Sequence, residues 1–272
     1  MTRVAVISLK GGTGKTTVCL GLAGAAAERG SHVLVVDLDP QANASAALGV
    51  TGPHLTISDA LADGRRGIAS DATVDSGWPT PQGVGLVRVV PSERSLEHRA
   101  TTEPGSHSRL HRVIDGVAGD NDLVLIDCPP TLGELTRNAL VAADVALIVT
   151  DPSYFALSGA QQAVDAVEVV RSTANPHLGL AGIVVNRVRS RSAEQTFRLD
   201  ELRLTYPDLL LEPTLSERVA VPASQGAGLP IQSWAGLGAR AFGADLSMLL
   251  DSVYARIGSL KPSHATVTGS SS

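Results

Sequence analysis

Short apolar runs alternate with longer stretches of helical periodicity along most of the chain. Runs rich in Val, Ile, Leu and Ala predict strands at residues 3–9, 32–38, 85–90, 123–126, 145–149 and 180–185. Helices are predicted over residues 16–28, 132–142, 157–172, 193–205 and 238–257. Strands that are apolar on both faces and separated by helices are typical of a parallel sheet covered on both sides. The pattern therefore predicts an α/β fold with a doubly wound, mostly parallel sheet and helices on both faces.

Two stretches follow neither period. Residues 64–81 are rich in Gly, Asp, Ser and Pro, which predicts a surface loop. Residues 261–272 are mostly polar and are predicted to form a disordered tail. No internal repeat and no linker divides the remaining chain, so we expect a single domain over residues 1–260.

The first predicted strand leads into the run Lys10-Gly11-Gly12-Thr13-Gly14-Lys15-Thr16-Thr17, which a predicted helix follows. This order of strand, glycine-rich turn and helix is the setting of a phosphate-binding loop. Its glycines let backbone N–H groups close around phosphate oxygens, and the start of the helix adds partial positive charge. Lys15 would bind the β- and γ-phosphates, and the Thr16 hydroxyl would bind Mg²⁺. The run therefore predicts a site for a nucleoside triphosphate and Mg²⁺.

The loop departs from the common form G-x-x-x-x-G-K-[ST] at its base. Leu9 stands where the first glycine belongs, and Lys10 follows it. Because Lys15 already serves the phosphates from inside the loop, Lys10 needs a separate explanation. The simplest interpretation is a solvated lysine that flanks a turn.

Carboxylates follow two of the predicted strands. Asp37 and Asp39 lie at the end of the second strand, and Asp127 follows the fourth. Side chains at i and i+2 share one face of a strand, and strand carboxyl ends border the ligand crevice of such sheets. We expect Asp39 to hold or polarise an attacking water, Asp37 to support the metal–phosphate region, and Asp127 to reach Mg²⁺ through water as a Walker B residue. The alternative for Asp37 and Asp39 is a pair of solvated strand-end carboxylates, and the Asp127 pattern is specific only as the third element in this order.

Taken together, the motifs at residues 10–17, 36–43, 126–130, 135–140 and 156–159 resemble the ParA/MinD group of deviant Walker-A ATPases. The resemblance extends over residues 1–257 and is to the small, Soj-like ParA proteins, because no helix-turn-helix extension precedes the first strand. It implies a P-loop NTPase that binds ATP and Mg²⁺ and forms an ATP-dependent homodimer. Lys10 would reach the phosphates of the partner subunit. The implied catalytic residues are Lys10, Lys15 and Asp39, and the implied metal site is Thr16, Asp39 and Asp127.

The same resemblance assigns residues to the base and to DNA. Asn186 matches an adenine-contacting asparagine, and Pro213 lies in the segment that usually lines the base. Non-specific binding of duplex DNA by the dimer would use four arginines, namely Arg187, Arg189, Arg191 and Arg218. The alternative is a solvated loop, because several acidic residues, among them Glu217, lie nearby in sequence.

Composition narrows the choice of function. The formal net charge of −5 gives the whole molecule no attraction to nucleic acid, so any DNA contact needs a local basic patch. Cys19 and Cys128 form no C-x-x-C pair, which predicts buried thiols and excludes the iron–sulfur relatives. No apolar run approaches the ~18 residues of a membrane span, and neither a signal peptide nor a terminal membrane helix is predicted. We expect a cytoplasmic, nucleoid-associated protein.

Two cargoes remain open from the sequence. The first is chromosome or plasmid DNA, segregated by ATP hydrolysis that a ParB-like partner stimulates. The second is a protein assembly, such as a microcompartment or receptor cluster, with a cargo adaptor as the activator. A metabolic P-loop enzyme is disfavoured by Lys10 and by the lack of a second set of catalytic groups.

Overall fold

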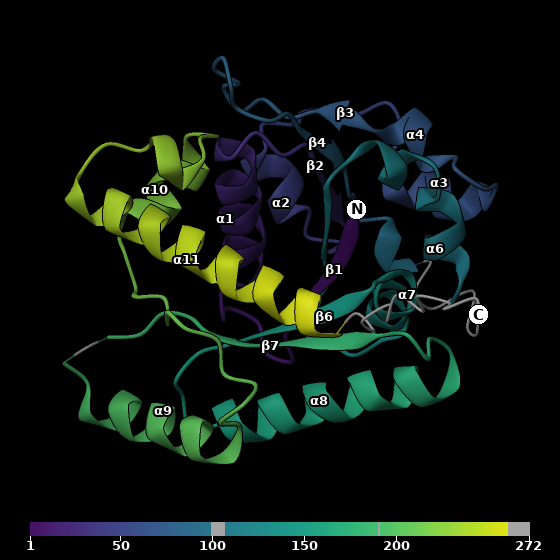
Figure 1. The fold of residues 1–272 in the computed structure, drawn as a ribbon. Helices are drawn as coiled ribbons and strands as arrows, with labels where there is room; N and C mark the ends of the chain where they lie inside the picture. Colours follow the sequence, from purple (N-terminus) through teal and green to yellow (C-terminus); the bar gives the residue numbers. More distant parts are fainter. Residues whose placement is uncertain (99–106, 190, 261–272) are drawn as a thin grey trace, which may run out of the picture.

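The computed structural model describes residues 1–98, 107–189 and 191–260, so the predicted tail lies outside the described residues. Seven strands form one sheet in the order β3-β4-β2-β5-β1-β6-β7 (Figure 1). Every neighbouring pair is parallel except β3 with β4. The strands are β1 (Thr2–Ile7), β2 (Val33–Asp37), β3 (Val74–Asp75), β4 (Val87–Val90), β5 (Leu123–Asp127), β6 (Val145–Thr150) and β7 (Gly179–Val185).

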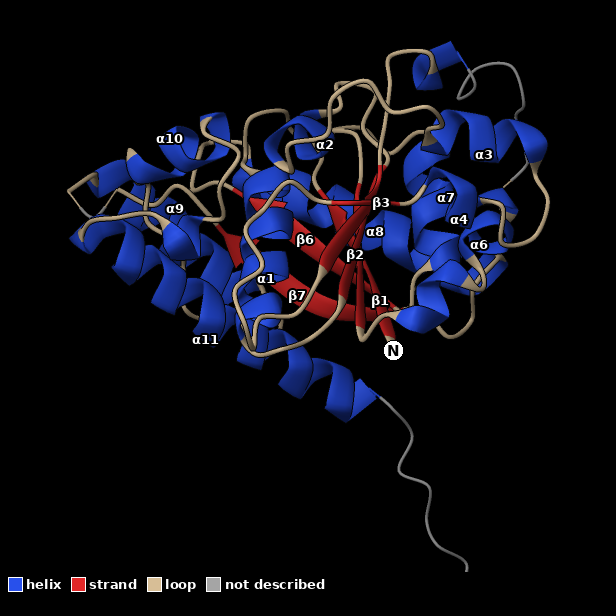
Figure 2. Cartoon of the chain, turned by 90° about the horizontal axis from the view of Figure 1, so that it is seen from above, coloured by secondary structure: helices blue, strands red, loops and turns tan. Residues whose placement is uncertain are grey.

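Helices cover both faces of the sheet, as Figures 1 and 2 show. One face carries α1 (Lys15–Glu28), α2 (Asn43–Ala47), α10 (Ala220–Gly226), the 3-10 turn η2 (Ile231–Ser233) and α11 (Leu237–Leu260). The other carries α3 (Ile57–Asp63), α4 (Ala69–Ala72), α6 (Arg109–Ile114), η1 (Val117–Asp120), α7 (Glu134–Ala142), α8 (Ala156–Thr173) and α9 (Ala193–Thr205). Along β1, Val4 and Val6 enter the first core, whereas Ala5 and Ile7 enter the second. This alternation explains why the strands are apolar throughout.

The predicted fold class is confirmed, and the six predicted strands and five predicted helices are all present. The prediction for residues 64–81 was wrong in part, because α4 and β3 lie within this stretch. β3 has only two residues, Val74 and Asp75, and is the edge strand that pairs with β4. A strand this short leaves no measurable alternation in the sequence. Cys19 and Cys128 are buried free thiols, as expected.

Because the strands that carry the site are parallel, the loops that follow them all begin at the same edge of the sheet. The loops after β1, β2, β5, β6 and β7 all leave the sheet from its carboxyl edge. Residues that are far apart in sequence, such as Lys15 and Asp127, therefore meet there. Within the described part of the chain, no helix combines the length and the hydrophobicity needed to cross a bilayer.

Candidate functional site

The phosphate loop connects β1 to α1 and depends on two left-handed glycines. Gly12 and Gly14 have φ angles of 84° and 85°, which lie in a region of backbone conformation that residues other than glycine rarely adopt. A Cβ atom at Gly14 would also lie 2.1 Å from Nδ2 of Asn186. The Thr13 hydroxyl is fixed inside the loop, 2.9 Å from the Ser8 hydroxyl. The loop is therefore a defined turn that leads into the start of α1, the arrangement whose backbone N–H groups bind phosphate in such loops.

A buried cluster of charges lies beneath this loop. Nζ of Lys15 donates to Oδ1 of Asp127 at 2.8 Å and lies 3.9 Å from Oδ2 of Asp39. The Thr16 hydroxyl donates to the other oxygen of Asp127 at 2.7 Å. Burial lowers the pKa of Lys15, but the charge and hydrogen bond of Asp127 outweigh burial, so this pKa lies above its usual value. Lys15, Thr16, Asp39 and Asp127 are thus brought together where the sequence places them.

The two carboxylates after β2 differ in their surroundings. Asp39 accepts a hydrogen bond from the Gln41 N–H at 3.0 Å, and burial raises its pKa. Asp37 accepts from the Ser45 N–H at 2.8 Å and from the Ser45 hydroxyl at 2.7 Å. Burial and the nearby Asp127 carboxylate raise the pKa of Asp37 to about 7. Asp37 therefore holds α2 and the turn that carries Asp39, and its predicted support of the metal–phosphate region stays a prediction.

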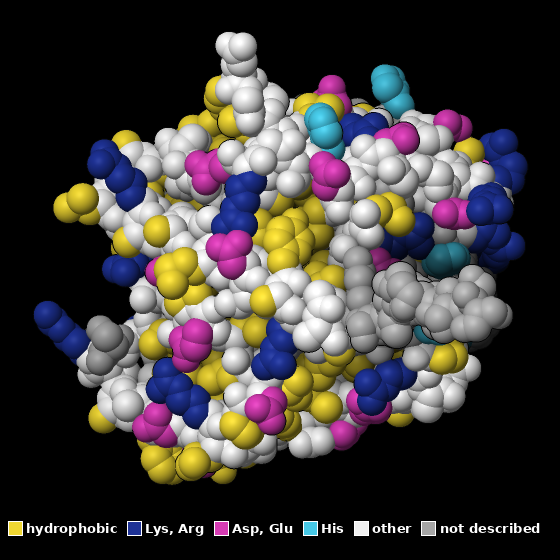
Figure 3. Space-filling view, in the orientation of Figure 1, with side chains coloured by type: hydrophobic (Ala, Val, Ile, Leu, Met, Phe, Trp, Pro, Cys, Tyr) yellow, Lys and Arg dark blue, Asp and Glu magenta, His cyan; other side chains and the backbone are white. Residues whose placement is uncertain are grey.

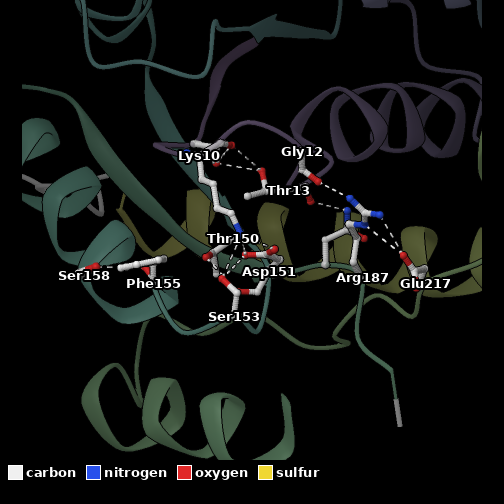
Figure 4. A network of polar contacts seen from close by, with 12 residues as sticks. Lys10, Gly12, Thr13, Thr150, Asp151, Ser153, Phe155, Ser158, Arg187 and Glu217 are labelled. Atoms are coloured by element: carbon white, nitrogen blue, oxygen red, sulfur yellow. Dashed lines mark hydrogen bonds and ion pairs between the residues drawn. The ribbon is translucent and has the colours of Figure 1, made fainter. Parts of the chain in front are cut away.

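Lys10 points away from its own loop, as Figure 4 shows. Its ammonium group lies 3.0 Å from Oδ2 of Asp151 and 3.2 Å from the Ser153 hydroxyl, both in the segment after β6. The Lys10 side chain is 49% exposed, against 6% for Lys15. Lys10 is therefore a cation on the surface that does not serve its own phosphate loop.

A cavity of about 530 Å³ lies beside the loop. Its walls come from the loop, from the start of α1, from the segment after β7, and from α10 and the residues before it. They include Gly12, Gly14, Thr17, Asn186, Arg187, Glu217, Arg218, Pro222 and Gln225. Asn186 is buried, and its side-chain amide donates to the Thr13 carbonyl at 2.9 Å. A cavity of this size next to a phosphate loop can hold a base and a sugar.

Pro213 does not line this cavity, and Pro222 does. The Glu212 carbonyl accepts a hydrogen bond from the Ser252 hydroxyl of α11 at 2.7 Å, and the Glu212 carboxylate pairs with Arg203 of α9. These contacts keep Glu212 and Pro213 beside α9 and α11. Whether Pro213 lines the base therefore stays a prediction, because the cavity beside the loop does not include it.

The predicted DNA-binding arginines lie in three different environments. Arg187 and Arg189 both bind the carboxylate of Glu217. Arg191 is exposed and makes no hydrogen bond or ion pair with any described residue. Arg218 lines the cavity, and its Nε atom is buried without a hydrogen-bond partner. Figure 3 shows Lys and Arg side chains projecting at its left edge, where α10, the start of α11 and the segment after β7 lie in Figure 1.

The sequence did not single out Asp151, Ser153 or Gln225 as site residues, and it indicated Glu217 only as an acidic neighbour of the arginines. Asp151 and Ser153 bind Lys10, Glu217 binds two arginines, and Gln225 donates to the Thr17 hydroxyl at 3.3 Å. Asp151 follows a buried strand, the same signal that identified Asp127, and could have been found in this way. Glu217 and Gln225 carry no such signal, because neither follows a strand.

The donor set suits a polyphosphate with Mg²⁺. The glycine turn, the start of α1 and Lys15 provide an anion site. No group of three or more His, Cys, Asp or Glu side chains in the described ranges could hold a metal ion alone. The Thr16 hydroxyl and a few waters would complete a coordination shell with phosphate oxygens, which is how Mg²⁺ is commonly bound.

Comparison with known proteins identifies the class. A family model described as an AAA domain matches residues 1–180. An uncharacterized protein of Mycobacterium tuberculosis is 35% identical over 91% of this chain and 78% of its own length. The chromosome partitioning protein ParA of Myxococcus xanthus is 31% identical over 84% of this chain and 80% of its own.

A solved structure agrees with this result. It is that of cobyrinic acid a,c-diamide synthase from Mycobacterium smegmatis with a bound ATP analogue and magnesium. The two chains are 29% identical, the match covers 90% of this chain and 93% of the other, and the TM-score is 0.71. The fold and the phosphate loop thus define a P-loop nucleoside triphosphatase. More particularly, the chain belongs to the ParA/MinD family of deviant Walker-A ATPases.

Proposed function

We propose that this protein binds ATP and Mg²⁺ at the phosphate loop and pairs with a second copy in the ATP-bound state. The dimer binds duplex DNA without sequence preference. A ParB-like partner stimulates slow hydrolysis, and the cycle moves chromosome or plasmid DNA. Membership of a family that includes a chromosome partitioning ParA supports this cargo.

The observation that carries the proposal is the position of Lys10. A cation that is half-exposed and directed away from its own loop is available to a second molecule. Pairing two phosphate loops face to face would bring each Lys10 toward the other nucleotide. There it would add positive charge to the transferring phosphoryl group, as an arginine finger does when supplied by a second protein. Asp151 and Ser153 hold Lys10 on the surface from which such a contact starts.

The remaining site residues divide the chemistry among them. When bound, Mg²⁺ supplies positive charge that neutralises phosphate oxygens. Lys15 binds and orients the phosphates from the floor of the loop, and the Thr16 hydroxyl, fixed by Asp127, holds the metal. Asp39, oriented by the Gln41 N–H, holds and polarises the attacking water. Asn186 stabilises the loop through the Thr13 carbonyl and borders the space for the base.

The test measures dimerisation and DNA binding together. Light scattering would follow the mass of the full chain with a non-hydrolysable ATP analogue or with ADP. Gel retardation of two unrelated duplexes would follow DNA binding under the same conditions. We expect a dimer that retards both duplexes with the analogue, and a monomer that retards neither with ADP.

Each part of the proposal has an outcome that contradicts it. A monomer with both the ATP analogue and ADP would reject the ATP-dependent dimer. A dimer that binds no duplex would reject DNA as the surface that the dimer binds and would favour another one, such as membrane or a protein scaffold. A protein that stays monomeric and hydrolyses ATP only with a small carboxylic acid would indicate a metabolic synthase.

A further inference from the structure

One carboxylate holds two of the predicted DNA-binding arginines. Oε1 of Glu217 lies 3.0 Å from Nη2 of Arg187, and its Oε2 accepts a hydrogen bond from Nε of Arg189. The two guanidinium groups lower the pKa of Glu217, so the carboxylate is ionised at neutral pH. The trio therefore has one net positive charge instead of two. A DNA phosphate that approaches Arg187 or Arg189 must compete with Glu217.

The trio is also connected to the phosphate loop. Nη1 of Arg187 donates to the Gly12 carbonyl at 2.6 Å, as Figure 4 shows. Arg187 has a φ angle of 60°, a left-handed conformation that is uncommon for a residue with a side chain and occurs often at functional sites. One guanidinium group thus joins the glycine turn to the carboxylate that also holds Arg189.

Two features make this contact adjustable. The side chains of Arg187, Arg189 and Glu217 are 48%, 64% and 32% exposed, and exposed ion pairs are weak. The position of Gly12 depends on the conformation of the glycine turn, which is where phosphate oxygens would lie. A shift of this carbonyl changes how strongly Arg187 binds the loop relative to Glu217. The strength of the ion pair between Glu217 and Arg189 changes as a result.

We propose that Glu217 restrains Arg187 and Arg189 and thereby makes DNA binding depend on the state of the phosphate loop. The inference rests on the DNA binding proposed above and adds its regulation. Arg191 makes no ion pair with a described residue and supplies charge in every state. The surface therefore has a constant part and a part that Glu217 controls.

The experiment compares Glu217→Gln with Glu212→Gln. Glu212 lies on the same segment and pairs with Arg203 at 3.1 Å, outside the trio. Both variants change the net charge equally, so a general charge effect would appear in both. Retardation of one duplex would be measured at several salt concentrations, with a non-hydrolysable ATP analogue and with ADP. A third variant, Glu217→Asp, keeps the charge and reports on the carboxylate itself.

The expected result has two parts. Glu217→Gln should steepen the slope of log K against log salt by ~0.9 for each additional phosphate contact. At low salt, where the weak binding of the ADP state becomes measurable, it should also increase affinity in that state by about threefold to tenfold, which narrows the difference in affinity between ATP and ADP. Glu212→Gln should follow the wild type in both slope and nucleotide dependence, and Glu217→Asp should lie closer to the wild type than Glu217→Gln does.

The controls separate this inference from the proposed function. If the wild type retards no duplex with the ATP analogue, DNA binding itself is wrong. If the wild type binds DNA but Glu217→Gln and Glu212→Gln have equal slopes and equal ATP-to-ADP ratios, Glu217 does not regulate the arginines. ATP affinity, measured by titration in each variant, identifies a substitution that has disturbed the loop instead.

Discussion

The two sides of the phosphate loop are built differently. On the inner side, the Lys15 ammonium group lies within 3.9 Å of a carboxylate oxygen of Asp127 and of one of Asp39. All three side chains are almost fully buried. On the outer side, Lys10 and Arg187 make contacts that leave about half of each side chain exposed. Buried ion pairs hold one geometry because breaking them leaves an unpaired charge in a medium of low polarity. Exposed pairs exchange partners readily.

This difference separates two tasks. A fixed inner side suits the binding of a nucleotide that must be aligned for reaction, whereas a changeable outer side suits contacts with other molecules. Lys10 and Lys15 show this difference most directly. They lie five positions apart in one loop, yet Lys15 is in a buried ion pair and Lys10 is a cation on the surface. Substitutions on the inner side should therefore abolish binding or chemistry, and those on the outer side should affect assembly and DNA.

The largest effect is expected for Lys15→Ala. It removes the phosphate-binding cation and leaves Asp127 buried without its ammonium partner. We expect at least ~100-fold weaker ATP binding in titration calorimetry, since a charged interaction is lost outright. The free energy of unfolding should fall by about 3–5 kcal/mol, because a buried charge loses its pair. Lys10→Ala is the matched control, and comparable ATP affinity for Lys15→Ala and wild type would remove Lys15 from the site.

Asp39→Ala tests the chemistry of the inner side separately from binding. We expect ATP affinity to be retained and hydrolysis to fall by ~10²–10⁴, the range seen when a positioned proton acceptor is lost. The ATP-bound dimer should accumulate, which light scattering would detect. Asp71→Ala, an exposed carboxylate of α4, is the control. Phosphate release at the wild-type rate would show that Asp39 does not position the water.

Lys10→Ala tests the outer side of the loop. The substitution leaves the buried cluster intact, so ATP should still bind with an affinity within about tenfold of the wild type. Dimerisation with a non-hydrolysable ATP analogue should be lost, as measured by light scattering. Lys10→Arg keeps a cation at this position and serves as the comparison. If Lys10→Ala forms the dimer and hydrolyses ATP normally, the side chain is only a solvated flank of the turn.

The smallest effect is expected for Arg191→Ala. Because Arg191 has no ion pair to lose within the described chain, its removal should leave stability unchanged within about 0.5 kcal/mol. The slope of log K against log salt for duplex DNA should decrease by ~0.9, the value for one phosphate contact. All sequences should weaken alike, since phosphate contacts carry no base information. The control is Arg171→Ala on α8, and an unchanged slope in both variants would exclude Arg191 from the DNA surface.

The inner side of the site could be predicted from the sequence, because its residues follow strands. Lys15, Asp39 and Asp127 come after apolar runs, and a parallel sheet brings the ends of such runs together. The outer side could not be predicted in this way. Glu217 meets Arg187 because residues 209–217 run beside β7, with the Leu215 N–H bound to the Val185 carbonyl at 2.9 Å. This segment has neither a strand nor a helix period.

The short helices show a similar limit. α3 begins with a capping box formed by Thr56 and Asp59, a signal that the sequence carries and that could have located it. α2 has only five residues, and its Ser45 is bound by Asp37 from the preceding strand. Its position therefore depends on a contact that local propensity does not encode.

The central position of β1 has a consequence for biosynthesis. β1 is hydrogen-bonded between β5 and β6, with Thr2 beside Leu123 and Ile7 beside Ile148. During translation, β1 is therefore synthesised well before β5 and β6, the strands that pair with it in the sheet. At about 5–20 residues per second, ribosomes deliver β6 roughly 7–30 s after β1. Until β5 and then β6 are synthesised, this apolar strand lacks its sheet neighbours, and transiently exposed apolar strands promote aggregation.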